Sequence, residues 1–384
     1  MKRFEQLDSI RGVACLMVLL YHFLLLFPQF VEPIMNVDGY WLIKLIRYTP
    51  LRVIWAGYEA VMLFFVLSGF VLALPFLTSR HTPYIPFAIK RIFRIYIPYI
   101  VAILIAITLS WTARSDIKEL SNWFNEFNWN TPFSWSLLGD HLVLVGEFDT
   151  HAFVPVVWSL VHEMRISLIF PFIMLAVIRF NWKWTVLISF LLSSIILVHW
   201  SWYSITLHYM FMFVIGALLA KHREFLIEQL KKTSRRTRLI FFVAAVLLLG
   251  LKIPGGMLPF GNPSLIKFVS EWGNSMGAAM LVILALSGGW FSKFLLLKPI
   301  HFIGKLSYSI YLYHLIALVT LINLLYGLLP FWLMLVIAFL ATIGVSALSY
   351  YWIELPSVAW GKYMAKKAQV FLNPRTASSP SKDI

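Results

Sequence analysis

Residues 7–22 read Leu7-Asp-Ser-Ile-Arg11-Gly-Val-Ala-Cys-Leu-Met-Val-Leu-Leu-Tyr-His22, an apolar run with a guanidinium near its start and an imidazole deep inside it. The run is too long for the hydrophobic part of a signal peptide and lacks a small-x-small cleavage site, so it predicts a retained membrane-spanning helix. Hydrocarbon accommodates ionisable side chains poorly, and an Arg or His within a span therefore indicates a functional site.

The composition extends this interpretation to the whole chain. Of the 384 residues, 60% are hydrophobic and 13% are charged, whereas a soluble domain is about 45–50% apolar and about 25% charged. Since a transmembrane helix needs about 20 mostly apolar residues, the sequence predicts an all-α, polytopic transmembrane helix bundle with about ten spans. The spans are expected near residues 10–30, 51–77, 95–113, 156–178, 184–200, 203–220, 239–252, 270–288, 304–326 and 330–353.

The formal net charge of +15 reflects membrane topology rather than a nucleic-acid partner. Most of the 32 Lys and Arg residues fall on alternate connecting segments, above all between Lys221 and Arg238. Cytoplasmic loops carry such an excess, so we expect both termini in the cytoplasm and a multi-pass protein of the plasma (inner) membrane. Residues 1–356 are expected to form the membrane domain. Residues 357–384 are rich in Lys, Ser and Pro and predict a disordered cytoplasmic tail.

The longest outer segment lies near residues 114–155. Its apolar residues follow helical spacing from a Ser115-Asp116 start, which predicts a short amphipathic helix. This helix either lies on the membrane surface or packs on the bundle. The residues concerned are Ile117, Leu120, Phe124 and Phe127.

His22 and Glu163 are the candidates for catalysis. Counted at about 1.5 Å per residue, His22 lies about 15–20 Å and Glu163 about 20 Å from the cytoplasmic boundary. Similar depth predicts a pair in which the carboxylate orients a neutral imidazole as a general base. The alternative is a buried histidine that is hydrogen-bonded to a backbone carbonyl or to water.

Polar residues cluster around Glu163 on its predicted helix. Ser159 and Ser167 share its face, and His162 and Arg165 form an adjacent stripe. Packing against lipid does not explain so many polar groups, so we expect them to line a cavity or a polar interior. His162-Glu163 begins a His-Glu-x-x-His pattern, but position 166 is Ile. No Cys/His cluster has metal-ligand spacing, so no metal site is expected.

Arg91 and Arg94 are the candidates for binding an anionic group. They stand three residues apart, on one helical face at the cytoplasmic lip of the third span. Guanidinium groups bind phosphate oxygens bidentately, so the pair matches a phosphate or pyrophosphate. Arg11, on the same side of the membrane, either shares this role or pairs with Asp8. A basic flank that only sets the topology is the alternative.

Three further polar positions complete the candidate sites. His314 is expected about 13–15 Å from the cytoplasmic side, shallower than His22, and Tyr308 adds a hydroxyl on a neighbouring face. Ser68 precedes Gly69 in a small-residue stretch of the second span. Polar packing between helices explains each of them at least as well as chemistry does.

These motifs, taken in order, resemble those of the acyltransferase 3 family of integral-membrane O-acyltransferases. Each motif is modest alone, but together they cover nearly the whole chain. The matching stretches are Leu7-Asp-Ser-Ile-Arg11-Gly through Tyr21-His22, Phe64-Phe65-Val-Leu-Ser68-Gly69-Phe70, Arg91-x-x-Arg94-Ile-Tyr96 with Pro98, Trp158-Ser159-Leu160-x-x-Glu163 to Phe170-Pro171, Gly304-x-x-Ser307-Tyr308-Ser309-x-Tyr311-Leu312-x-His314, and Ile353-Glu354-x-Pro356. The residues directly after Glu163 depart from the family pattern, which commonly has an acidic or amide residue and aromatics there.

The resemblance implies an acyl-CoA donor, usually acetyl-CoA, that is taken from the cytoplasm as a co-substrate, with no permanently bound cofactor. It also implies a carbohydrate-like or otherwise hydroxylated acceptor, often an envelope glycan, modified at or near the outer face. Arg91 and Arg94 would hold the CoA phosphates, and His22 would be the catalytic base. Direct transfer and an acyl-enzyme relay both fit these residues.

Two other function classes fit the same residues. A transporter or flippase for a lipid-linked or polar solute explains the polar interior but predicts no dependence on CoA. A non-catalytic scaffold predicts that replacing His22 or Arg91 changes nothing beyond protein abundance. Transporters often have Gly/Pro-broken helices in corresponding halves, and because no such pair is evident, the sequence favours an enzyme.

Overall fold

The computed structural model describes residues 4–31, 41–78, 82–113, 117–253 and 262–372. These residues form helices and no strands, as the all-α prediction requires. Eight helices are long and apolar enough to cross a membrane, which confirms a transmembrane helix bundle. They are α1 (Glu5–Leu24), α4 (Gly57–Thr78), α5 (Tyr84–Leu109), α8 (Val157–Arg179), α10 (Trp202–Lys232), α12 (Pro263–Leu286), α14 (Lys298–Leu325) and the continuous helical segment Phe331–Leu372.

Two of the expected spans correspond to shorter helices. α9 (Trp182–Ser194) has 13 residues and α11 (Arg235–Leu249) has 15, fewer than the roughly 20 that a span needs. The count of ten spans and the cytoplasmic termini therefore stay predictions. The remaining short helices include α2 (Pro28–Val31), α3 (Trp41–Tyr48) and α13 (Trp290–Leu295).

Short polar side chains start several of these helices. Ser201 and Ser204 form a capping box at α10, in which each side chain accepts a hydrogen bond from the other residue's backbone N–H. The side chains of Asn181, Ser234 and Asn262 accept backbone N–H groups at the starts of α9, α11 and α12. Each helix thus begins where a polar cap meets an apolar run, whose backbone groups pair within the helix.

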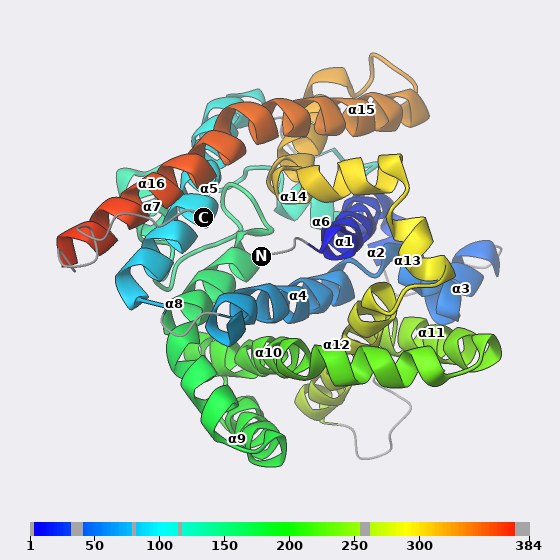
Figure 1. The fold of residues 1–384 in the computed structure, drawn as a ribbon. Coiled ribbons are helices and arrows are strands. Elements are labelled where there is room, and N and C mark those ends of the chain that lie inside the picture. Colours follow the sequence, from blue (N-terminus) through cyan, green and yellow to red (C-terminus); the bar gives the residue numbers. More distant parts are fainter. Residues whose placement is uncertain (1–3, 32–40, 79–81, 114–116, 254–261, 373–384) are drawn as a thin grey trace.

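α1 lies inside the bundle and packs against α4 and α14 (Figure 1). Glycines make the closest crossings possible. A Cβ atom on Gly12 would lie 2.6 Å from the Gly304 nitrogen, and one on Gly69 would lie 2.2 Å from the Phe213 oxygen. The small-residue stretch at Ser68-Gly69 is therefore a contact surface between α4 and α10, in accord with the packing alternative for Gly69.

The last helical segment is longer than the sequence predicts. α15 (Phe331–Ser349) passes through a π-helical turn (Tyr350–Glu354) into α16 (Leu355–Leu372), which lies along α5 (Figure 1). The Ser357 hydroxyl donates to the Phe93 carbonyl of α5. The prediction of disorder is therefore wrong for residues 357–372, because contacts with α5 order them. Residues 373–384 lie outside the described residues.

The α5–α8 loop (residues 117–156) carries two short helices, α6 (Asn122–Glu126) and α7 (Trp135–Val143). α6 is shorter than predicted because it begins after Ser121, whose hydroxyl accepts the Phe124 N–H and so caps the helix. The predicted start at Ser115-Asp116 lies outside the described residues. Ile117, Leu120 and Phe124 are buried, so these apolar residues pack on the bundle rather than on a membrane surface.

Candidate functional site

A cavity of about 580 Å³ lies between α1, α4, α5, α8, α14 and the start of α16. Its volume is within the range of small-molecule sites, roughly 300–1,000 Å³. Five cationic and three acidic side chains line it, so the lining carries a net positive charge. The cationic residues are Arg11, Arg91, Arg94, Lys305 and Lys362, and the acidic ones are Asp8, Glu163 and Glu354. Ser68 and Tyr308 also line this cavity, which we call the donor cavity after the hydrogen-bond donors of its Arg, Lys, Ser and Tyr side chains.

Arg91 is held in the donor cavity by residues of a neighbouring helix. Its Nη2 donates to Glu163 Oε1 at 2.9 Å and to Ser167 Oγ at 3.0 Å, and Ser68 Oγ donates to the same carboxylate oxygen at 3.1 Å. The Arg91 Nε is buried and has no hydrogen-bond partner among the described residues. α5 begins at Tyr84, so Arg91 and Arg94 lie within this helix, which starts earlier than the span expected near residue 95.

The position of Arg11 fits both predicted alternatives, a place beside Arg91 and Arg94 and a contact with Asp8. It lines the donor cavity together with Arg91 and Arg94, and its Nη1 is 3.8 Å from Asp8 Oδ1, one turn earlier on α1. Three guanidinium groups from two helices therefore converge on one cavity. This arrangement can bind the oxygens of a phosphorylated ligand at several points.

His22 is paired with His314 and not with Glu163. His22 Nδ1 lies 2.9 Å from the Val18 carbonyl oxygen and 3.1 Å from His314 Nε2. His314 Nδ1 lies 3.0 Å from the Ile310 carbonyl oxygen. A carbonyl can only accept a hydrogen bond, so each neutral ring carries its proton on Nδ1. The one Nδ1–H of His22 is therefore shared between the Val18 carbonyl and His314 Nε2, and His22 Nε2 keeps its lone pair, which is the form of a general base.

Two predictions made from depth are wrong, each for its own reason. The predicted pairing of His22 with Glu163 fails because similar depth does not fix the position around the bundle axis, and Glu163 faces Arg91 instead. His314 is not shallower than His22, since the two rings are in contact, with centroids 5.0 Å apart. The depth of His314 was counted from residue 304, whereas α14 begins at Lys298.

Aromatic side chains enclose the two histidines. Tyr311 lines the donor cavity, and its ring centroid lies 6.1 Å from that of His314. Its hydroxyl is fixed by Ser159 Oγ at 2.7 Å and by the Val156 carbonyl at 3.1 Å. From the α5–α8 loop, the Trp123 ring lies 5.5 Å from the His22 ring. The motif containing Tyr311 pointed to this residue, but no sequence signal indicated Trp123 as a neighbour of His22.

His162 and Arg165 do not reach the donor cavity. His162 Nδ1 is 2.8 Å from Thr206 Oγ1, and the ring stacks on Trp202 of α10. Arg165 donates to the carbonyls of Val145 and Gly146 at 2.9 and 2.6 Å. His162 is thus a packing residue between α8 and α10, and Arg165 anchors the α5–α8 loop.

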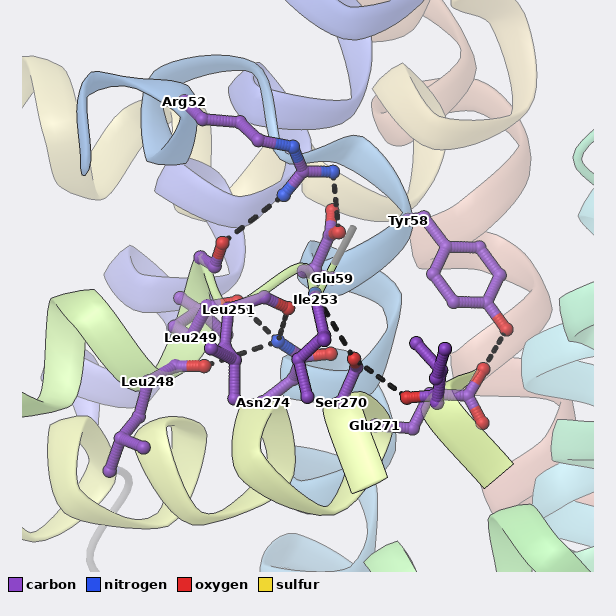
Figure 2. A network of polar contacts seen from close by, with 12 residues as sticks. Arg52, Tyr58, Glu59, Leu248, Leu249, Leu251, Ile253, Ser270, Glu271 and Asn274 are labelled. Carbon is purple, nitrogen blue, oxygen red and sulfur yellow. Dashed lines mark hydrogen bonds and ion pairs between the residues drawn. The ribbon is translucent and has the colours of Figure 1, made fainter. Parts of the chain in front are cut away.

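A second buried polar network joins α4, α10, α11 and α12, and its acidic residues were missed by sequence reasoning. Figure 2 shows Tyr58 and Glu271 facing each other, and Glu59 facing Arg52, which it meets at 2.6 Å. On the side not drawn there, His208 Nε2 lies 2.5 Å from Glu271 Oε2. Asn274 donates to carbonyls at the end of α11. Each of these side chains has at least one partner, although Glu59 Oε2 is buried without one among the described residues, so we interpret the network as structural.

No group of three or more His, Cys, Asp or Glu side chains in the described residues could hold a metal ion. Cys15 is buried and its Sγ donates to the Ser307 carbonyl. Comparison of the sequence with protein families gives a match to the acyltransferase domain, Acyl_transf_3, over residues 4–351. Comparison with curated proteins found no match, and comparison with solved structures found none either.

Proposed function

Because the chain belongs to the acyltransferase 3 family and is an integral-membrane acyltransferase, we propose that it transfers an acetyl group from acetyl-CoA to a hydroxyl of a carbohydrate-like acceptor. In this proposal the donor enters from the cytoplasm, and the acceptor is modified at the outer face of the plasma membrane. The single observation that carries it is the net positive donor cavity, where three guanidinium groups converge a short way from a histidine pair.

The donor cavity suits a phosphorylated thioester. Arg11, Arg91 and Arg94 would bind the phosphates of the CoA nucleotide, since Arg pairs with phosphate oxygens through parallel N–H groups. The buried, unpartnered Nε of Arg91 is a free donor for this purpose. Glu163 is a positioning residue in this scheme, because its contacts to Arg91 and Ser68 fix the guanidinium between α4, α5 and α8.

His22 is the proposed general base, and His314 is the residue that orients it. His22 Nε2 takes the proton of the acceptor hydroxyl as the hydroxyl oxygen attacks the thioester carbonyl carbon. The C–S bond then breaks, and the thiolate receives the same proton from the imidazolium, so that an ester and CoA–SH leave without net proton change. The partner that orients His22 is an imidazole instead of a carboxylate. Because His314 contacts the Nδ1 of His22, the Nε2 of His22 is directed away from His314.

Tyr311 stands between the donor cavity and the histidine pair. For the thioester to meet His22, the Tyr311 ring must either lie along its path or turn aside, so this residue controls how far the acyl group reaches. Tyr311→Phe removes the hydroxyl that Ser159 and Val156 fix while keeping the ring. We expect it to change kcat more than the KM for acetyl-CoA.

Membrane vesicles with acetyl-labelled acetyl-CoA and acceptor pools of the native host test the proposal. His22→Ala should abolish label transfer at matched expression, whereas Arg91→Gln should lower it and raise the KM for acetyl-CoA. His199→Ala and Lys90→Gln are matched controls, because both side chains are exposed and neither lines the donor cavity. Equal labelling by His22→Ala removes His22 from catalysis.

The same assay separates the other function classes. If no acceptor pool is labelled, a transporter or flippase for a polar solute becomes the better proposal, and solute movement across the vesicle membrane is then the measurement. Unchanged labelling with all variants would leave the candidate residues without a catalytic role.

A further inference from the structure

A second cleft, of about 310 Å³, opens on the α5–α8 loop. Its lining combines one aromatic face, Phe127, with two carboxylates, Glu126 and Asp149, and with Asn130 and His151. These residues come from two stretches of the loop, 126–131 and 149–152. The donor cavity shares none of these lining residues, so the loop cleft is a separate site. By the charge distribution of the sequence, this loop faces the outer side.

The two rims of the loop cleft are held together. Trp129 Nε1 donates to the Phe153 carbonyl at 2.8 Å, which ties one stretch to the other. Asn128 pairs with Asn323 of α14 through two side-chain hydrogen bonds of 3.3 and 2.5 Å. Since both ties are buried, the shape of the loop cleft is preorganised on the bundle.

The loop cleft is connected to His22 through two aromatic rings. Ser121, at the start of α6, donates its hydroxyl to the Leu25 carbonyl at 2.5 Å, just beyond the end of α1. This contact sets Trp123 against His22, with ring centroids 5.5 Å apart. Trp123 in turn lies 5.5 Å from Phe127, which forms the wall of the loop cleft.

The charge of the loop cleft is negative. Burial lowers the pKa of His151, and this effect exceeds the raising effect of Asp149 and Glu126. The lining thus holds two carboxylates and one histidine, whose Nδ1 lies 3.9 Å from Asp149 Oδ1, and its formal charge is negative. Asp149 Oδ1 accepts the His151 backbone N–H at 2.9 Å, which leaves its second oxygen available to a ligand hydroxyl.

We propose that the loop cleft binds the polyhydroxylated part of the acceptor, and that this acceptor is neutral or cationic rather than anionic. The proposal rests on the proposed function and names its substrate class. Carboxylate and amide oxygens accept hydrogen bonds from sugar hydroxyls, and the Phe127 face covers the apolar face of a sugar ring. An anionic ligand is repelled by Glu126 and Asp149, whereas an amino sugar is attracted.

The test measures the binding of three trisaccharides to the full-length protein in nanodiscs, without acyl donor. The probes are neutral tri-N-acetylchitotriose, cationic chitotriose and anionic trigalacturonate. The dissociation constant of each is measured by titration calorimetry. The wild-type protein should bind the first two at least about tenfold more tightly than the third. Asp149→Asn should reduce the ratio of the affinities for the cationic and the anionic probe by about two- to fivefold, which is the effect of removing one partly exposed charge. It should change binding of the neutral probe less than binding of the charged probes, because Asn keeps the Oδ1 acceptor for His151 and its amide can still donate to a sugar hydroxyl.

Two further variants separate the loop cleft from the rest of the loop. Phe127→Ala should weaken the neutral probe by about tenfold. Glu147→Gln and Trp135→Ala are matched controls, since both side chains are exposed on the same loop but lie outside the cleft. Absence of trisaccharide binding, preference for the anion, or binding that Asp149→Asn and Phe127→Ala leave unaltered overturns the proposal.

Binding of CoA to the same nanodiscs, with and without Arg91→Gln, tests the proposed function on its own. If the wild-type protein does not bind CoA but its trisaccharide binding depends on the loop-cleft residues, the proposal for the loop cleft holds and CoA is excluded as the carrier of the acyl donor. If CoA binding depends on Arg91 but trisaccharide binding does not depend on the loop-cleft residues, the proposed function holds and the proposal for the loop cleft is overturned.

Discussion

The crossing of α1 and α14 at Gly12 offers the sharpest structural prediction. A methyl group on Gly12 would lie 2.6 Å from the Gly304 nitrogen, whereas ordinary contacts begin at 3.4 Å. Gly12→Ala must therefore push the two helices apart by about 0.8 Å, because the atoms in its way are backbone. Overpacking of this kind destabilises proteins by about 1–3 kcal/mol.

The same displacement reaches the proposed catalytic pair. His22 lies ten residues beyond Gly12 on α1, about 15 Å along the helix, and is hydrogen-bonded to His314 of α14 at 3.1 Å. If a shift of about 0.8 Å is carried along α1, the two nitrogens separate to about 3.9 Å, which is beyond hydrogen-bond range. His22 then loses its partner on α14 and keeps only the Val18 carbonyl of its own helix, so activity should fall together with stability.

Gly344→Ala is the matched control, since Gly344 also lies in a membrane helix and nothing stands within 4 Å of an added Cβ. There the gain in helix propensity of about 1 kcal/mol acts alone. We expect the thermal midpoint of the purified protein to fall for Gly12→Ala and to hold or rise for Gly344→Ala, and label transfer to follow. If Gly12→Ala has the same thermal midpoint and the same activity as the wild type, the tight crossing at Gly12 is refuted.

Three further predictions concern residues outside the donor cavity. Glu271→Ala should destabilise the protein by about 3–5 kcal/mol, because alanine leaves the buried His208 and Tyr58 donors without their acceptor. Glu271→Gln should destabilise it by less, and equal thermal midpoints of the two variants would contradict this. Arg165→Lys should speed proteolysis of the α5–α8 loop, because lysine cannot hold both carbonyls, and an unchanged cleavage rate argues against this anchor. Burial lowers the pKa of His141 from 6.5 to about 4, so the unfolded loop binds more protons and loop stability falls as the pH drops from 6.5 to 4. Hydrogen exchange across that range should show a loss of loop protection in wild type and a smaller loss in His141→Gln, in which His151, whose pKa is also lowered by burial, still contributes.

Much of the fold was accessible from the sequence because hydrocarbon imposes strict rules on composition and length. The long spans, a close helix contact near Gly69 and the membrane class all follow from apolar runs and small residues, whereas the partner helix at Gly69 does not. The helix at Leu355–Leu372 was missed because its residues are polar and amphipathic. Its order comes from contacts with α5, such as that of Ser357 with Phe93, which no local pattern reveals.

The site was predictable in its parts but not in its pairings. Arg11, Arg91, Arg94, Glu163, Ser68 and Tyr308 do line one cavity, because polar groups within spans must find a polar interior. Sequence gives the height of each residue along its helix but not its position around the bundle. Glu163 and His22 were therefore paired by height, whereas the helix crossings bring Glu163 to Arg91 and His22 to His314.

α1 explains why one short stretch of sequence carried so much of the inference. Its first turns place Arg11 in the donor cavity, Gly12 makes the crossing with α14, and Cys15 hydrogen-bonds the Ser307 carbonyl of the same helix. Its last turn presents His22, and directly beyond it Leu25 receives the hydroxyl of Ser121, which fixes the α5–α8 loop. Donor cavity, histidine pair and loop cleft are thus aligned by a single helix. A change in the tilt of α1 must alter all three together, which is why one methyl group at its crossing with α14 is expected to disturb binding, chemistry and stability at once.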